Sequence, residues 1–158
     1  MALNKHWIFF GIALIILLLD QLSKYFVSIY MYSKEFSFLT IHFVKNYGIG
    51  FGLFDLPEIR FVLIMVIVLI IIGIVYYYCR DKTNGVFFII SLALILGGAL
   101  GNLTDRIMYG FVIDFVDFGF WPAFNIADSA ITVGVVFLII YFWKFSTKNR
   151  KSRKNRKV

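Results

Sequence analysis

The sequence predicts an all-helical membrane protein with four transmembrane helices and a small β element outside the membrane. Three observations support this prediction. Hydrophobic residues make up 61% of the 158 residues and charged residues only 16%, and the mean hydropathy is +0.85, which excludes an ordinary soluble domain. A span needs ~20 apolar residues, so the chain holds about four. The positive charge is concentrated after the last apolar run, as expected where a span reaches the cytoplasm.

The first span, at about residues 7–27, contains Asp20 and Lys24. Four residues separate them, so they lie on one helix face and each partly neutralises the other. A snorkelling interfacial pair and a functional pair are both open interpretations. We disfavour a cleaved signal peptide, because no small-residue cleavage site follows the apolar run.

The segment at about residues 34–55 has a β-like pattern. Residues alternate in character from Phe36 to Val44, and three spaced glycines follow. This predicts a small aromatic strand or hairpin on the membrane surface. The glycine spacing does not indicate a dinucleotide site, because no strand-turn-helix unit surrounds it. His42 has no second His or Cys at metal-ligand spacing.

The second and third spans, at about residues 59–79 and 86–106, differ in polarity. The second carries no evident chemistry. Gly97 and Gly101 lie on one face of the third and favour close helix packing. The end of the third span also carries polar side chains that packing does not require: Asn102, Asp105 and Arg106.

The fourth span, at about residues 124–144, precedes a basic stretch that holds eight of the sixteen Lys and Arg residues between Lys144 and Lys157. Such a block is too charged to fold alone, and it suits anchoring to anionic lipid better than RNA binding, since no aromatic residues are interleaved. We therefore expect a membrane domain over residues 1–145, a cytoplasmic tail over residues 146–158, and both termini in the cytoplasm.

Three carboxylates in different spans are expected at a similar depth. At about 1.5 Å per residue, Asp20 lies roughly 20 Å from the inner face, Asp105 ~28 Å and Asp128 ~24 Å. The apolar core is ~30 Å thick, and Asp114 lies in the outward connection after the third span. The polar residues therefore converge near the outer face.

We interpret Asp114 and Asp128 as a catalytic pair. Two carboxylates held close share a proton and titrate in two steps, so an ionised Asp can activate water while a protonated Asp donates to a scissile carbonyl. Asp117 is either an alternative partner or a solvated loop charge. Intramembrane Asp residues also build proton or cation pathways, so a small transporter is an alternative, although no inverted repeat is evident. A scaffold protein is a third hypothesis.

Five short segments, in this order, resemble the lipoprotein signal peptidases, also called signal peptidase II. They are Asp20-Gln-Leu-Ser-Lys24, Asn46-Tyr-Gly48, Gly101-Asn-Leu-Thr-Asp-Arg106, Ile113-Asp114-Phe115 and Phe124-Asn-Ile-Ala-Asp128. The resemblance covers nearly the whole chain.

The resemblance implies an aspartyl endopeptidase of the bacterial inner membrane that removes signal peptides from prolipoproteins. It cuts before a diacylglyceryl-modified cysteine, at a site near the outer face. The resemblance also implies that Asp114 and Asp128 form the dyad, in preference to Asp117, and that residues 33–57 form a β-cradle. Other matching positions line or support the site: Asn46, Gly48, Asn102, Arg106, Asn125, Asp20, Lys24 and Asp105.

We expect the lipid-modified prolipoprotein and membrane phospholipid as partners, no nucleic acid, no metal or cofactor, and a monomer. Asn102 and Asn125 are suited to orient the carboxyl groups or bind a substrate backbone. Arg106 is expected to pair with Asp105 or brace the helix end, and Asp105 to have a structural role. Fourteen residues separate Asp114 from Asp128, which is shorter than the family typically has and indicates an abbreviated outer connection.

Overall fold

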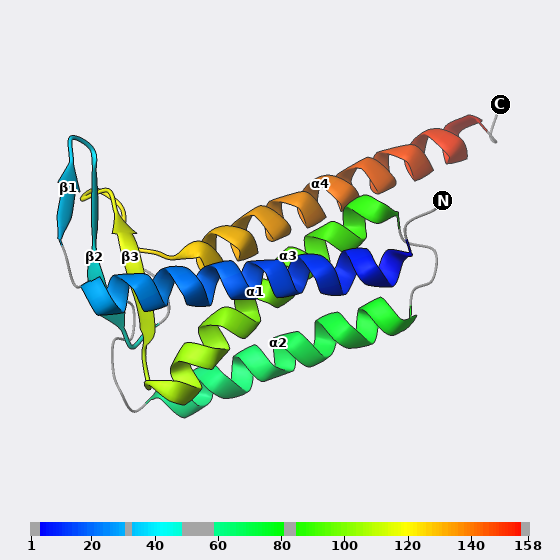
Figure 1. Cartoon of the computed structure of the whole chain (residues 1–158). Coiled ribbons are helices and arrows are strands. Elements are labelled where there is room, and N and C mark those ends of the chain that lie inside the picture. The colour runs from blue at the N-terminus through cyan, green and yellow to red at the C-terminus, as the bar shows by residue number, and fades with distance from the viewer. Residues whose placement is uncertain (1–3, 31–32, 49–58, 81–84, 156–158) are drawn as a thin grey trace.

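The computed structural model describes residues 4–30, 33–48, 59–80 and 85–155, with side chains as far as residue 144. The four helices form a bundle with a three-stranded sheet at one end, and α1 begins and α4 ends at the opposite end (Figure 1). In chain order the elements are α1 (Lys5–Tyr30), β1 (Lys34–Phe36), β2 (Leu39–Asn46), α2 (Arg60–Arg80), α3 (Val86–Met108), β3 (Val112–Asp117) and α4 (Ile126–Asn155).

The predicted fold class is confirmed. In the described part of the chain, four helices are long and apolar enough to cross a membrane, at Lys5–Tyr30, Arg60–Arg80, Val86–Met108 and Ile126–Lys144. Each boundary lies within three residues of the predicted one, because the length of an apolar run is set by local composition.

The basic stretch after the fourth span does not begin a separate structural element. The backbone of α4 continues as one helix as far as Asn155, so the block is an extension of an existing helix, and the expectation that it is too charged to fold alone stays a prediction. Extending an existing helix adds one hydrogen bond per residue and needs no new nucleus. Lys and Arg are good helix formers, and positive charge is favourable near a helix C-terminus. The division into domains at residue 145 stays a prediction.

α3 is the central helix of the bundle. In its most apolar stretch 67% of residues are buried, compared with 17% in α1 and α4 and 11% in α2. Glycines allow this packing: a Cβ on Gly97 would lie 2.6 Å from the backbone oxygen of Ala13 in α1, and one on Gly98 would clash with the backbone oxygen of Ala127 in α4. Glycine therefore lets α3 contact both neighbours backbone to backbone, which confirms the predicted close packing.

The sheet has the order β1-β2-β3 and is antiparallel throughout. β1 and β2 form the predicted hairpin, and residues 49–55 of the predicted β element lie outside the described residues. β3 was not predicted as a strand. Its partner, β2, lies far away in the sequence, and the pairing sets Val44 opposite Asp114 and Asn46 opposite Val112. The register thus brings the end of β2 beside the aspartate of β3.

Candidate active site

Asp114 and Asp128 are held by asparagine side chains. Asp114 lies in β3 and is 1% exposed, whereas Asp128 is half-buried in the first turn of α4. Asp114 accepts hydrogen bonds from Nδ2 of Asn46 at 2.8 Å and Nδ2 of Asn125 at 2.7 Å. Oδ1 of Asp128 accepts one from Nδ2 of Asn102 at 2.8 Å. Each carboxylate is therefore oriented by amide donors.

Asn125 connects the two aspartates. Its Nδ2 donates to Asp114 and also to Oδ1 of Asn102, at 3.2 Å. Its Oδ1 accepts from the backbone N–H of Asp128 at 2.9 Å, and its own backbone N–H donates to Oδ2 of Asp128 at 3.3 Å. This reciprocal pair is a capping box at the start of α4. The N-terminal cap of the helix thereby fixes one carboxylate and reaches the other.

The environment of Asp114 favours its protonated form. Burial, followed by the negative charge of Asp128, raises the pKa of Asp114 to about 7. Hydrogen bonds from Asn46 and Asn125 and the charge of Lys24 act in the opposite direction. At neutral pH Asp114 retains a proton for much of the time.

Asp117 belongs to the sheet surface. Its Oδ2 lies 2.9 Å from Nε2 of His42, and its Oδ1 accepts from the backbone N–H of Gly119. The hydrogen bond from Gly119, followed by that from His42, lowers the pKa of Asp117. These contacts account for Asp117 and for His42 without a role in the dyad. Among the described residues, no group of three His, Cys, Asp or Glu side chains is placed to hold a metal ion.

Asp20, Lys24 and Asp105 form a buried triad between α1 and α3. The Nζ atom of Lys24 lies 2.7 Å from Asp20 and 2.8 Å from Asp105, and the three residues are 2% exposed or less. The snorkelling interpretation of Asp20 and Lys24 is therefore wrong, because a partner on another helix holds the ammonium group inside the bundle. The expected common depth of the carboxylates agrees with these contacts.

Arg106 does not pair with Asp105, contrary to our expectation. The carboxylate of Asp105 instead forms an ion pair with Lys24 and accepts a hydrogen bond from Gln21. Nη2 of Arg106 donates to the backbone oxygen of Gly48 at 2.8 Å. Arg106 is 7% exposed, and its Nε has no hydrogen-bond partner among the described residues. Arg106 therefore connects α3 to the end of β2.

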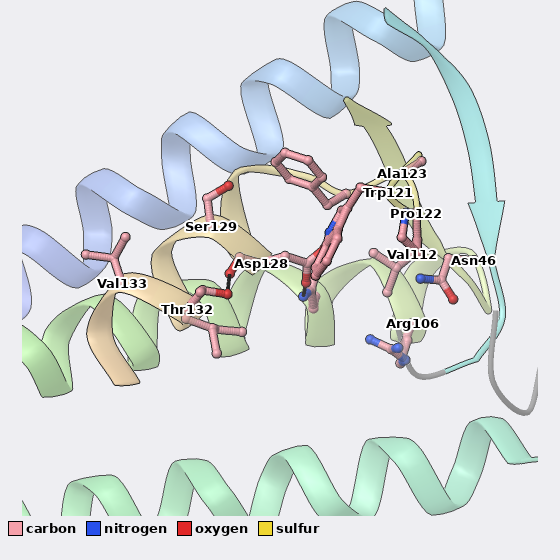
Figure 2. Close-up of a pocket in the computed structure, with 13 residues that line it drawn as sticks. Asn46, Arg106, Val112, Trp121, Pro122, Ala123, Asp128, Ser129, Thr132 and Val133 are labelled. Atoms are coloured by element: carbon pink, nitrogen blue, oxygen red, sulfur yellow. Dashed lines mark hydrogen bonds between the residues drawn. The ribbon is translucent and has the colours of Figure 1, made fainter. Parts of the chain in front are cut away.

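A cavity of about 480 Å³ lies beside Asp128. Figure 2 shows Asp128, Asn46 and Arg106 around it, with Trp121 and Pro122 from the connection between β3 and α4. Asp114 does not line this cavity. The apolar part of the wall was not predicted, and the apolar stretches close to Asp128 are the one signal for most of it. The apolar residues of the wall are Val112, Trp121, Pro122, Ala123, Phe124, Ile131 and Val133.

A family sequence model and individual relatives that match this chain indicate the same family. A sequence model of the family described as signal peptidase (SPase) II matches residues 12–144. The lipoprotein signal peptidase of Halothermothrix orenii is 39% identical over 138 residues, covering 84% of this chain and 93% of that protein. The one from Thermodesulfovibrio yellowstonii is 44% identical over 134 residues, with 79% and 87% coverage. The one from Staphylococcus aureus is 35% identical over 151 residues, with 90% and 91% coverage.

Solved structures show the same fold. One, described as a bacterial membrane enzyme structure obtained by the in meso method at 2.3 Å resolution, has a TM-score of 0.80 and 32% sequence identity, and it covers 87% of this chain and 88% of its own. A second, described in the same words at 1.9 Å resolution, has a TM-score of 0.74 and 34% identity, with coverage of 83% and 89%.

Proposed function

This chain belongs to the signal peptidase II family, and we propose on that basis that it is a multi-pass bacterial membrane endopeptidase that processes prolipoproteins. The peptidase removes the signal peptide by cutting before the diacylglyceryl-modified cysteine. The transporter alternative is not supported, because the relatives that match most of the chain are named as peptidases. An aspartic mechanism, with Asp114 and Asp128 as its catalytic residues, is the finer part of the proposal.

One observation carries the mechanism: two carboxylates from different elements belong to one network of amide donors, and one of the two lines a cavity. The carboxylates of Asp114 in β3 and Asp128 in α4 both accept hydrogen bonds from Asn125, and Asp128 lines the cavity. A structural capping role explains Asp128 alone. It does not explain a second carboxylate, buried beside the first, whose pKa is raised to about 7.

The two environments support different roles for the two aspartates. The oxygen of a water molecule attacks the scissile carbonyl carbon, and ionised Asp128 accepts a proton from this water. Protonated Asp114 donates its proton to the carbonyl oxygen. When the tetrahedral intermediate collapses, the C–N bond breaks. Asp128 then gives its proton to the leaving amine, and Asp114 recovers a proton from a hydroxyl group of the intermediate. A water molecule held between the two carboxyl groups stays a prediction.

The cavity suits an apolar, extended substrate. Its wall combines aromatic and aliphatic side chains such as Trp121 and Val133 with donors from Asn46 and Arg106. Apolar walls favour lipid chains and the apolar part of a signal peptide, and a few polar groups fix the orientation of the peptide backbone. We propose that Arg106 and Asn46 bind backbone carbonyl oxygens of the substrate.

Orientation in the membrane follows from charge and topology. α1 begins and α4 ends at one end of the bundle, and the sheet and the start of α4 lie toward the other (Figure 1). Asp114 belongs to this sheet, and Asp128 to the first turn of α4. Because the basic residues concentrate after the fourth span, we propose that the end where α1 begins and α4 ends is cytoplasmic and that the active site lies near the outer face. We retain the predictions of a monomer surrounded by phospholipid.

Incubation of the purified protein with a diacylglyceryl-modified lipobox peptide tests the proposal. We expect cleavage before the lipid-bearing cysteine, little cleavage of the unmodified peptide, and no effect of a chelator. Asp114→Asn and Asp128→Asn should each lower kcat by about 10³-fold, because each removes an acid or base that contributes 10²–10⁴-fold. Asp117→Asn is the matched control and should retain activity. Cleavage by either dyad variant at the unsubstituted rate would exclude the mechanism.

A further inference from the structure

We propose that Asp20, Lys24 and Asp105 are positioning residues that fix the separation between Asp114 and Asp128. This inference rests on the proposed aspartyl mechanism. It assigns the triad a task beyond general support of the helix bundle.

Each acid of the triad binds the backbone immediately before one catalytic aspartate. Oδ1 of Asp20 accepts from the backbone N–H of Ala127 at 2.9 Å, and Ala127 precedes Asp128. Oδ2 of Asp105 accepts from the backbone N–H of Ile113 at 3.1 Å, and Ile113 precedes Asp114. Asp20 on α1 thus holds the start of α4, which carries Asp128. Asp105 on α3 holds β3, which carries Asp114.

Lys24 joins these two attachments into one brace. Its ammonium group contacts Asp20 at 2.7 Å and Asp105 at 2.8 Å. Gln21 makes a second connection, because its Nε2 donates to Asp105 at 2.9 Å and to Asp20 at 3.3 Å. The three side chains are buried, so separating their charges would leave an unpaired ion inside the bundle, which is costly. The distance between Ala127 and Ile113 is therefore strongly restrained.

Lys24 also sets the orientation of the amide that binds Asp128. Its third hydrogen bond goes to Oδ1 of Asn102, at 3.2 Å. An ammonium group has only donors, so it requires the oxygen of this amide and directs Nδ2 of Asn102 toward Asp128. The same oxygen accepts from Asn125. The charge on Lys24 thereby determines which atoms face the catalytic carboxylate.

The triad does not line the cavity beside Asp128. Loss of the brace should therefore change the catalytic step and leave substrate binding nearly unchanged. A residue that only stabilised the bundle would reduce the amount of folded protein. It would not alter the turnover of the molecules that remain folded.

The test variant is the double substitution Lys24→Met/Asp105→Asn. It keeps the net charge of the triad and retains an oxygen opposite the N–H of Ile113, but it removes the cation that connects the two acids. We expect kcat per folded molecule to fall about 100-fold, as for a displacement of about 1 Å at the reacting groups. KM should change less than threefold, because the triad does not line the cavity beside Asp128.

If the double variant does not fold, Asp20→Asn/Lys24→Met/Asp105→Asn takes its place. It contains no buried charge at these positions and keeps an acceptor at both backbone sites, and the same kinetic result is expected. Ser28→Ala is the matched control. It removes the hydrogen bond from Ser28 to the backbone of Lys24 on the same helix, and it should keep kcat within twofold of the unsubstituted protein.

Two kinds of failure can be distinguished. If Asp114→Asn retains activity, the aspartyl mechanism is wrong, whatever the triad variants do. If Asp114→Asn is inactive but a folded triad variant keeps kcat within threefold, only the positioning role is wrong. Amide hydrogen exchange supplies a readout independent of turnover: exchange at Ala127 and Ile113 should accelerate in the triad variants, and unchanged exchange would also overturn the positioning role.

Discussion

Gly98 is the position where one added methyl group should displace Asp128, one of the two proposed catalytic residues, without touching it. A Cβ at this position would clash with the backbone oxygen of Ala127 and lie 2.8 Å from Cγ1 of Ile131, both in α4. The side chain of Ile131 can rotate away. The backbone oxygen of Ala127 cannot, so Gly98→Ala should push the first turn of α4, which carries Asp128, away from α3.

The size of the effect follows from these contacts. Ordinary van der Waals contact begins at 3.4 Å, whereas the added Cβ would lie 3.2 Å from the carbonyl carbon of Ala127 and closer still to its oxygen, so the backbone of α4 has to shift. A misplacement of about 1 Å at a reacting group costs roughly 10²-fold in rate. We therefore expect kcat of Gly98→Ala to fall by about 10- to 100-fold, which corresponds to about 1.4–2.7 kcal/mol of transition-state stabilisation. Overpacking should also lower the free energy of unfolding by about 1–3 kcal/mol.

The assay is steady-state cleavage of the lipid-modified peptide, together with thermal unfolding in the same detergent. Gly73→Ala is the matched control, because a Cβ at Gly73 in α2 meets nothing within 4 Å. This control should keep its activity and should not lose stability. The reasoning is refuted if Gly98→Ala turns over at the unsubstituted rate, or if Gly73→Ala loses as much activity as Gly98→Ala.

Three further predictions concern proton binding and the sheet. Activity should decline above a pH of about 7 as Asp114 loses its proton. Asn46→Ala should move this decline in kcat to higher pH, because removing a donor to the carboxylate raises the pKa of Asp114. A shift to lower pH would contradict the assignment of the decline to Asp114. Asp117→Asn should reduce thermal stability at pH 7. The lowered pKa of Asp117 stabilises the fold above pH 3.8, and this contribution is lost as the pH falls through the lowered value. An equal loss of stability at pH 2 would argue against this origin of the effect. Gly110→Ala should destabilise the protein by about 1–2 kcal/mol in thermal unfolding. Gly110 has φ +87°, and an added Cβ would lie 3.1 Å from Nη1 of Arg60. Unchanged stability would show that this turn tolerates a side chain.

The local properties of the chain determine much of its architecture. The four spans were predicted because each is a continuous apolar run long enough to cross a membrane. The similar depth of Asp20, Asp105 and Asp128 followed from the constant rise of a helix, and contacts such as that of Asp20 with Ala127 agree with it. The ordered motifs also indicated the family, which the comparisons confirm.

Strand β3 and the contacts of Arg106 could not be predicted in this way. Residues 112–117 form a strand because β2, about 70 positions earlier, supplies the hydrogen-bonding partners. Arg106 follows Asp105 directly and was expected to pair with it. In the folded chain Lys24 reaches Asp105 from another helix, so Arg106 binds Gly48 instead. In both cases a distant partner outweighs the neighbour in sequence.

The sequence by itself determined the four spans, the β hairpin and the types of polar residue available at the sheet end of the bundle. These depend on composition and helix geometry, which act over a few turns of chain. Only the tertiary structure decided that Asp20 and Asp105 bind the backbone before Asp128 and Asp114, and that Lys24 joins them. Such contacts depend on how α1, α3, β3 and α4 meet, and the free energy of burying their charges is settled only when all of these elements are in place.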